Sequence, residues 1–184
     1  MAREIKVYTF DELSEEAKKT AIDSMRDDVA NNLNSFDADD FRATVKEVCD
    51  VFNAKSSGRY WTDLHYRGDN YDEYVDEGGN ETAETVRKFV EDRLTWADID
   101  IKKDYPFTGV FSDDAACKYI EQVLKGEKVP ESIDEFIKEL GDEIHYQWEQ
   151  QEDANSDDEV VAEFLSANGY DFLESGAPLK GNLI

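Results

Sequence analysis

Residues 132–148, with the sequence SIDEFIKELGDEIHYQW, decide the fold class of this chain. Ser132, followed three positions later by Glu135, forms a capping box just after a proline and marks the start of a helix. Gly141 should weaken that helix by about 1 kcal/mol relative to alanine. The apolar residues recur every three or four positions, which predicts the longest helix of the chain with one buried face. That face carries Ile133, Ile137, Leu140, Ile144 and Trp148.

Caps and apolar stripes on both sides of this segment predict more helices, and alternating stretches predict strands. We expect strands in EIKVYTF (4–10) and RYWTDLHY (59–66), and a short third strand near YDFLES (170–175). Residues 67–80 should form a loop. The fold class that follows is α+β, a small antiparallel β-sheet packed with about six α-helices. The remaining helices are expected to begin at Ser14, Asp37, Asn80 or Thr82, Ser112 and Ser156.

The length of 184 residues suits one domain, because chains of this size bury a single large core. We expect a single domain over 1–184, with an acidic helical part at 131–174 and a frayed tail at 176–184. Hydrophobic residues make up 40% of the chain and aromatic residues 12%, which favours a packed core over disorder. We find neither a signal peptide nor a run of 18 apolar residues in the sequence, so we expect a soluble, cytoplasmic protein.

The charge balance is the most unusual property of the sequence. It has 20 Lys and Arg residues against 45 Asp and Glu residues, a net charge of −25. Affinity for nucleic acids and for anionic lipids comes from clustered Lys and Arg. The composition therefore argues against direct binding to nucleic acid or to a membrane.

The acidic residues concentrate near the carboxyl end. Residues 131–184 carry 15 acidic residues and only two basic ones, Lys138 and Lys180. Acids that fall off the apolar stripe must face water, and like charges four residues apart on a helix repel each other slightly. The arrangement therefore suggests a role beyond folding. We predict a partner-binding surface formed by Asp134, Glu135, Glu139, Asp142, Glu143, Glu149, Glu152, Asp153, Asp157, Asp158 and Glu159.

Two interpretations of this acidic surface stay open. Net negative charge can simply maintain solubility and keep the protein away from nucleic acid. Alternatively, carboxylates three or four residues apart on a helix lie about 5–6 Å from each other, which is comparable to the phosphate spacing along one nucleic-acid strand. A rigid acidic face of this kind could enter a basic groove by DNA mimicry and exclude the true ligand.

The sequence shows no motif that carries chemistry, so we predict no catalytic, cofactor-binding or metal site and no enzymatic activity. The two histidines, His65 and His145, lie in no ligand or nucleophile spacing. Cys49 and Cys117 fall in helical apolar patterns and are expected to be reduced core thiols. Residues 153–157 resemble the start of a calcium loop, but the required glycine and glutamate are missing.

An aromatic-rich segment runs through the expected second strand and into the loop after it. Acidic residues surround its aromatic rings, and this combination suits binding to a protein better than stacking on nucleic-acid bases. A strand core followed by a loop would also explain it. The aromatic residues are Tyr60, Trp61, Tyr66, Tyr71 and Tyr74.

Three stretches of the sequence resemble a diffuse group of acidic phage and prophage proteins. They are KVYTFDELSEEAKKTAIDSM near the start, FTGVFSDDAACKYI in the middle and ANGYDFLESG near the end, together about a quarter of the chain. Members of the group begin with a strand and an "ELSEEAK" helix, end near "ANEYEF..G", and are in some cases labelled antitoxin. Many have a Gly-Asp-Gly strand motif, for which this sequence offers only Arg67-Gly68-Asp69-Asn70. The resemblance implies a phage product that acts in a bacterial cytoplasm.

We therefore expect an acidic inhibitor of a bacterial defence nuclease, of the anti-CRISPR or anti-restriction type, that binds a basic nucleic-acid groove. The alternatives are an antitoxin-like protein that neutralises a partner toxin and, less favoured, a metal-dependent enzyme. The sequence leaves open whether the chain is a monomer or a homodimer. Reversing Glu139, Asp142, Glu149 and Asp153 to Lys should abolish inhibition and leave folding intact.

Overall fold

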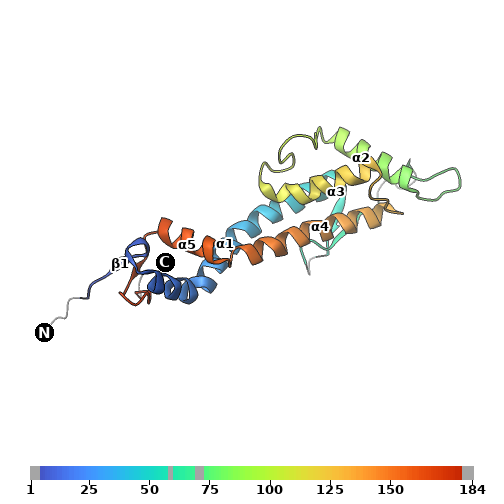
Figure 1. The fold of residues 1–184 in the computed structure, drawn as a ribbon. Helices are drawn as coiled ribbons and strands as arrows, with labels where there is room; N and C mark the ends of the chain where they lie inside the picture. The colour runs from blue at the N-terminus through green and yellow to red at the C-terminus, as the bar shows by residue number, and fades with distance from the viewer. Residues whose placement is uncertain (1–4, 58–59, 69–72, 180–184) are drawn as a thin grey trace. The chain divides into compact units, whose positions relative to one another are not determined.

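The computed structural model describes residues 5–57, 60–68 and 73–179 (Figure 1). Within these ranges it has five α-helices and two separate two-stranded antiparallel sheets, so the predicted α+β class is confirmed. The strands form two small sheets rather than one. None of the helices in these ranges is long and apolar enough to cross a membrane.

The chain divides into two compact units. The first contains residues 1–37 and 150–184, and the second contains residues 38–149. The expectation of a single domain over 1–184 stays a prediction.

Helix α1 (Glu15–Val51) contributes to both units, where the sequence predicted two helices. The Ser14 hydroxyl accepts a hydrogen bond from the Ala17 amide at 3.2 Å, which confirms the predicted cap. The second helix start, at Asp37, is wrong. The connecting residues contain neither glycine nor proline, so nothing interrupts the helix. Asp37 instead accepts a hydrogen bond from the side chain of Asn155 at 2.7 Å.

The first unit has its own small core. Strand β1 (Tyr8–Thr9) pairs antiparallel with β4 (Asp171–Phe172), and the short 3-10 helix η1 (Phe10–Glu12) leads into α1. Helix α5 (Asp158–Ala167) packs its buried Val161 and Leu165 against the α1 stripe. Phe10 and Phe172 meet edge to face, with ring centroids 6.2 Å apart. The core residues of this unit are Phe10, Leu13, Ala17, Ala21, Met25, Val29, Val161, Leu165 and Phe172.

The expected frayed tail is held in place as far as residue 179. The Leu179 amide donates to the Asp171 carbonyl at 3.0 Å, and Phe172 forms a bridge with Pro178. Gly176 lies against α1 with a φ of +85°, and a Cβ there would come within 2.0 Å of the Ala17 carbonyl oxygen. The expectation of fraying therefore fails for 176–179, and residues 180–184 lie outside the described ranges.

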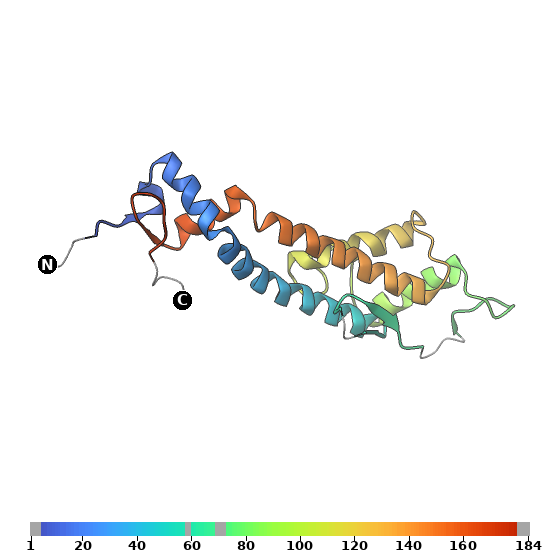
Figure 2. The ribbon, with the colours of Figure 1, turned by 90° about the horizontal axis from the view of Figure 1, so that it is seen from below.

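The core of the second unit lies between four helical segments and a hairpin. Phe41 packs on Trp148 and Phe52 packs on Phe136, with ring centroids 5.4 and 5.3 Å apart. These pairs show that α1 and α4 (Ile133–Ala154) run antiparallel in this unit, and the two helices lie side by side in Figures 1 and 2. Helices α2 (Ala83–Trp96) and α3 (Asp114–Lys125) complete the core through aromatic contacts to Phe136.

A β-hairpin follows α1 where the sequence predicted only a break in the helix. Asn53 ends the helix region with a φ of +52°, a backbone state that Asn tolerates well. Strand β2 (Ala54–Ser56) then pairs antiparallel with β3 (Leu64–Tyr66), so the predicted strand at 59–66 is confirmed at its carboxyl end. The hairpin approaches α4 closely at Gly141, where a Cβ would lie 2.2 Å from the Thr62 carbonyl oxygen.

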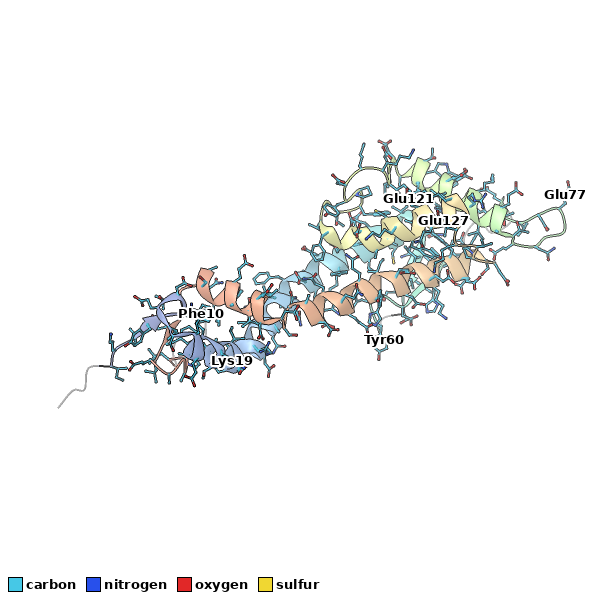
Figure 3. All side chains as sticks on the ribbon, viewed as in Figure 1. Phe10, Lys19, Tyr60, Glu77, Glu121 and Glu127 are labelled. Atoms are coloured by element: carbon cyan, nitrogen blue, oxygen red, sulfur yellow. The ribbon has the colours of Figure 1, made fainter. Side chains whose placement is uncertain are left out.

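Helix α2 is flanked by a loop before it and by an irregular stretch after it. Asp76 accepts hydrogen bonds from the amides of Gly78 and Asn80, and Glu77 lies at the loop tip (Figure 3). Residues 69–72 of the predicted loop lie outside the described ranges. Thr82 caps α2, one of the two predicted starts. Residues 97–110 form no helix or strand and lead into the 3-10 helix η3 (Phe111–Asp113).

Candidate protein-binding surface

The start of α4 fixes the rotational phase of its acidic residues. The Ser132 hydroxyl accepts a hydrogen bond from the Glu135 amide at 3.1 Å, which confirms half of the predicted capping box. The Glu135 carboxylate accepts from the Glu131 amide at 2.6 Å, and the Glu81 carboxylate accepts from the Ile133 amide at 3.2 Å. These contacts satisfy amides that would otherwise lack partners at a helix start. With the apolar stripe packed inward, Asp134, Asp142 and Glu149 are turned toward water.

The six predicted acids of the second unit fall into two groups. Asp134, Asp142 and Glu149 are exposed, and Glu135, Glu139 and Glu143 are half-buried. Only one basic residue, Lys138, interrupts the 13 acidic residues between 131 and 163. Three of the six already have partners elsewhere in the unit: Asp134, Glu139 and Glu143. The Tyr66 amide donates to Asp134 at 3.2 Å, and the ammonium of Lys128 lies 3.7 Å from Glu143.

Glu139 has a structural role that the sequence did not reveal. The hydroxyl of Tyr119, which is buried on α3, donates a 2.6 Å hydrogen bond to its carboxylate. Burial, together with this bond and the nearby negative charges, raises the pKa of Tyr119 well above its usual range. Substituting Lys for Glu139 would remove the acceptor of a buried hydroxyl, which typically costs about 1–3 kcal/mol. Glu139 is therefore a poor site for testing a surface interaction without disturbing the fold.

The predicted acids of the first unit lie at the end of α4 and the start of α5. Asp153, Asp157, Asp158 and Glu159 are exposed, and Glu152 is half-buried. Asp157 is the N-cap of α5, one residue later than the predicted Ser156, and Asp158 and Glu159 occupy the first turn. Negative charge at this end of a helix is stabilised by the helix dipole. Part of the clustering here therefore has an explanation within the fold.

Arg26 pairs with this acidic turn inside the first unit. Its guanidinium lies 2.7 Å from Asp158 and 3.1 Å from Asp23, and it donates to the Ser156 carbonyl at 2.6 Å. The hydrogen bonds to the two carboxylates raise the pKa of Arg26. Asp158 is thus partly neutralised, and Asp153, Asp157 and Glu159 make no ion pair within the described ranges.

Residues 153–157, which resembled a calcium loop, form part of the connection between α4 and α5. The side chain of Asn155 is buried and donates to Asn34 and Asp37, each at 2.7 Å. Residues 5–57, 60–68 and 73–179 bring together no group of three or more His, Cys, Asp or Glu side chains able to hold a metal ion.

The histidines and cysteines are placed where they make no nucleophilic pair in the described residues. The Nε2 of His65 lies 3.4 Å from Asp63, and that of His145 lies 3.5 Å from Glu149. Cys49 and Cys117 are free thiols, the first buried and the second half-buried. Burial raises the pKa of both, that of Cys117 to about 12 with a further contribution from Asp113 and Asp114. Thiols with raised pKa values are protonated at neutral pH and react poorly.

The described part of the aromatic segment lies largely in the core. Tyr66 and Tyr74 pack edge to face on Phe89, with centroids 5.5 and 5.1 Å away. Trp61 packs on Trp148 at 6.0 Å. Among the described members of the segment, Tyr60 projects outward, with 59% of its surface exposed (Figure 3). Tyr71 lies outside the described residues.

Two residues of the second unit were not singled out from the sequence. Asp113 is fully buried, and its carboxylate accepts four hydrogen bonds, from the hydroxyls of Thr44 and Thr108 and the amides of Phe107 and Thr108. No local pattern marks it, because its partners come from α1 and from a loop. Tyr146, on the outer face of α4, is 58% exposed. Its position off the apolar stripe was readable from the sequence.

We compared the chain with known proteins. No protein-family model matches it, and neither the curated proteins nor the solved structures contain a significantly similar chain.

Proposed function

We propose that this protein is a phage-encoded inhibitor of a bacterial defence nuclease, of the anti-CRISPR or anti-restriction type, and that it acts in the bacterial cytoplasm by DNA mimicry. It would bind a basic nucleic-acid groove and do no chemistry of its own. The observation that carries the proposal is the exposure of carboxylates on helices and at one helix N-cap. They are Asp134, Asp142 and Glu149 in the second unit, and Asp153, Asp157, Asp158 and Glu159 in the first. The phage association comes from the sequence resemblance.

The helical setting of these acids supports the proposal on physical grounds. A helix holds carboxylates at fixed spacings of about 5–6 Å between neighbouring turns, whereas a tail would let them spread apart. Ordered charges lose less entropy when a complementary cationic groove closes on them. Long-range attraction between opposite charges also speeds association, and salt weakens it. Inhibition should therefore be strongest at low ionic strength.

A charge-reversal pair of variants tests the proposal. The first carries Asp142→Lys, Glu149→Lys, Asp153→Lys and Glu159→Lys. These four acids are exposed and accept no hydrogen bond from buried groups in the described ranges. Glu139 is left unchanged because it holds Tyr119.

The matched control variant reverses four other exposed acids, so its net charge changes by the same amount. It carries Glu16→Lys, Asp27→Lys, Glu84→Lys and Glu91→Lys on α1 and α2. Both variants and the parent are assayed for inhibition of duplex DNA cleavage by a panel of purified restriction and CRISPR nucleases. We expect the parent to block at least one nuclease competitively with DNA, the first variant to lose at least a hundredfold in potency, and the control to stay within about fivefold. Absence of inhibition across the panel, or equal losses in both variants, would refute the proposal.

In the antitoxin-like alternative, the aromatic segment would matter more for binding than the acidic helices. Trp61, Tyr66 and Tyr74 are engaged in core packing, which leaves Tyr60 as the described member with most of its ring exposed. The structure therefore gives this alternative less support than the acidic helices give the inhibitor.

A further inference from the structure

We propose, resting on the proposed function, that the outer face of α4 in the second unit recognises arginine rather than lysine on its partner, with Tyr146 as the aromatic anchor. The sequence prediction treated this face as a set of charges alone. The structure adds an exposed ring among them, and the combination fits one kind of cation better than the other.

Tyr146 is free to receive a partner. Its side chain is 58% exposed. Between residues 5 and 179, the two short undescribed gaps excepted, it makes no hydrogen bond, ring stack or cation contact. Trp96, which is similarly exposed, differs because the guanidinium of Arg93 already lies 5.3 Å from its ring centroid. The same contact shows the geometry that we expect a partner arginine to adopt on Tyr146.

Carboxylates lie one helical turn away from the ring on both sides. Asp142, four residues earlier, is exposed and has no ion pair in the described part of the chain. Glu149, three residues later, is also exposed, and among the described residues its ion-pair partner is the half-exposed His145, whose Nε2 lies 3.5 Å from the carboxylate. Residues three or four apart on a helix are surface neighbours about 5–6 Å apart. A cation on the ring of Tyr146 can therefore reach at least one of these carboxylates.

This combination distinguishes the two basic side chains. A guanidinium is planar, is weakly hydrated, stacks flat on an aromatic ring, and still directs N–H donors sideways to a carboxylate. An ammonium is a strongly hydrated point charge that gains mainly from the carboxylates. Exposed cation–π contacts contribute about 0.5–1 kcal/mol. A guanidinium that makes this contact, where an ammonium stays hydrated and does not, is preferred about two- to fivefold.

The test compares the full chain with hexa-arginine and hexa-lysine peptides as probes, by isothermal titration calorimetry at low and moderate salt. We expect the parent to bind hexa-arginine about two- to fivefold more tightly than hexa-lysine, and Tyr146→Ala to abolish that preference without weakening hexa-lysine binding. Tyr60→Ala is the matched control, because Tyr60 is 59% exposed and lies on the hairpin rather than on α4. It should keep the preference. The ring protons of Tyr146 should shift in NMR spectra with the arginine peptide.

Each result bears on the inference or on the proposed function. Equal affinity of the parent for the two peptides, or an equal loss of preference in the two tyrosine variants, overturns the arginine inference but leaves the acidic surface intact. Failure of both peptides to bind at low salt removes the cation-binding surface, and with it the proposed function. Loss of hexa-lysine binding in Tyr146→Ala would show that the substitution disturbs α4 and would overturn the anchor role.

Discussion

Replacing Gly141 with alanine should destabilise the second unit, against the usual rule for helices. Glycine inside a helix is about 1 kcal/mol less favourable than alanine, so helix propensity alone predicts a gain. In the structure, the added Cβ would lie 2.2 Å from the Thr62 carbonyl oxygen and 3.0 Å from the Cγ of Leu64. The closer neighbour is backbone, which cannot rotate out of the way. The hairpin must therefore move.

The size of the effect follows from that distance. Ordinary van der Waals contact between a Cβ and another heavy atom begins at 3.4 Å, so the hairpin would have to move away from α4 by about 1 Å. Overpacking of a tight core costs about 1–3 kcal/mol, and a clash with backbone belongs at the upper end. After subtracting the propensity gain, we expect a net loss of about 2 kcal/mol in the free energy of unfolding of this unit. For a chain of this size, that corresponds to about 4–8 °C in Tm.

The assay is urea unfolding followed by circular dichroism and by tryptophan fluorescence. The ring centroids of Trp61, in the hairpin, and Trp148, on α4, lie 6.0 Å apart, so their fluorescence reports on how the hairpin packs against α4. Lys138→Ala, an exposed substitution one turn earlier, is the control and should change stability by less than about 0.5 kcal/mol. A Gly141→Ala protein as stable as the parent, or more stable, would refute the reasoning.

Three more predictions concern buried contacts. Asp113→Ala should cost about 3–5 kcal/mol in urea unfolding, because it removes a fully buried carboxylate and leaves the half-buried amides of Phe107 and Thr108 without acceptors. A loss below about 1 kcal/mol would contradict this. Burial raises the pKa of Glu81, so its stabilising contribution is complete below its unfolded pKa and is lost as pH rises through the folded pKa. Glu81→Gln keeps an acceptor for the Ile133 amide. Its free energy of unfolding should rise relative to that of the parent as the pH rises from about 4 to 7. A difference between the two proteins that does not change with pH would contradict this prediction. Gly176→Ala should destabilise the first unit by more than about 2 kcal/mol in thermal unfolding. The left-handed φ of +85° at Gly176 and its contact with the Ala17 carbonyl both exclude a side chain. An unchanged Tm would show that residues 176–179 contribute nothing to the stability of this unit.

Local signals in the sequence located most helix starts. Ser14, Thr82 and Ser132 accept the cap hydrogen bonds that their positions predicted. These bonds form between residues three apart, so the information lies within one turn of chain. The predicted helix start at Asp37 was wrong. A residue that caps helices well can also lie inside a helix when no glycine or proline adjoins it. The continuity of α1 was decided by what each of its halves packs against.

For the surface, the sequence by itself determined the charge and, through the helical period, which acids of α4 face water. It could not show that Glu139 serves a buried tyrosine, that Asp134 meets the hairpin, or that Asp113 anchors a loop to α1. Those partners lie 20, 68 and 69 residues away, and only tertiary packing brings them together. Exposure along one helix is a matter of periodicity, whereas the partner of a polar group depends on which distant segment folds against it. Tertiary structure therefore separated the acids that hold the fold from those left free to meet another molecule.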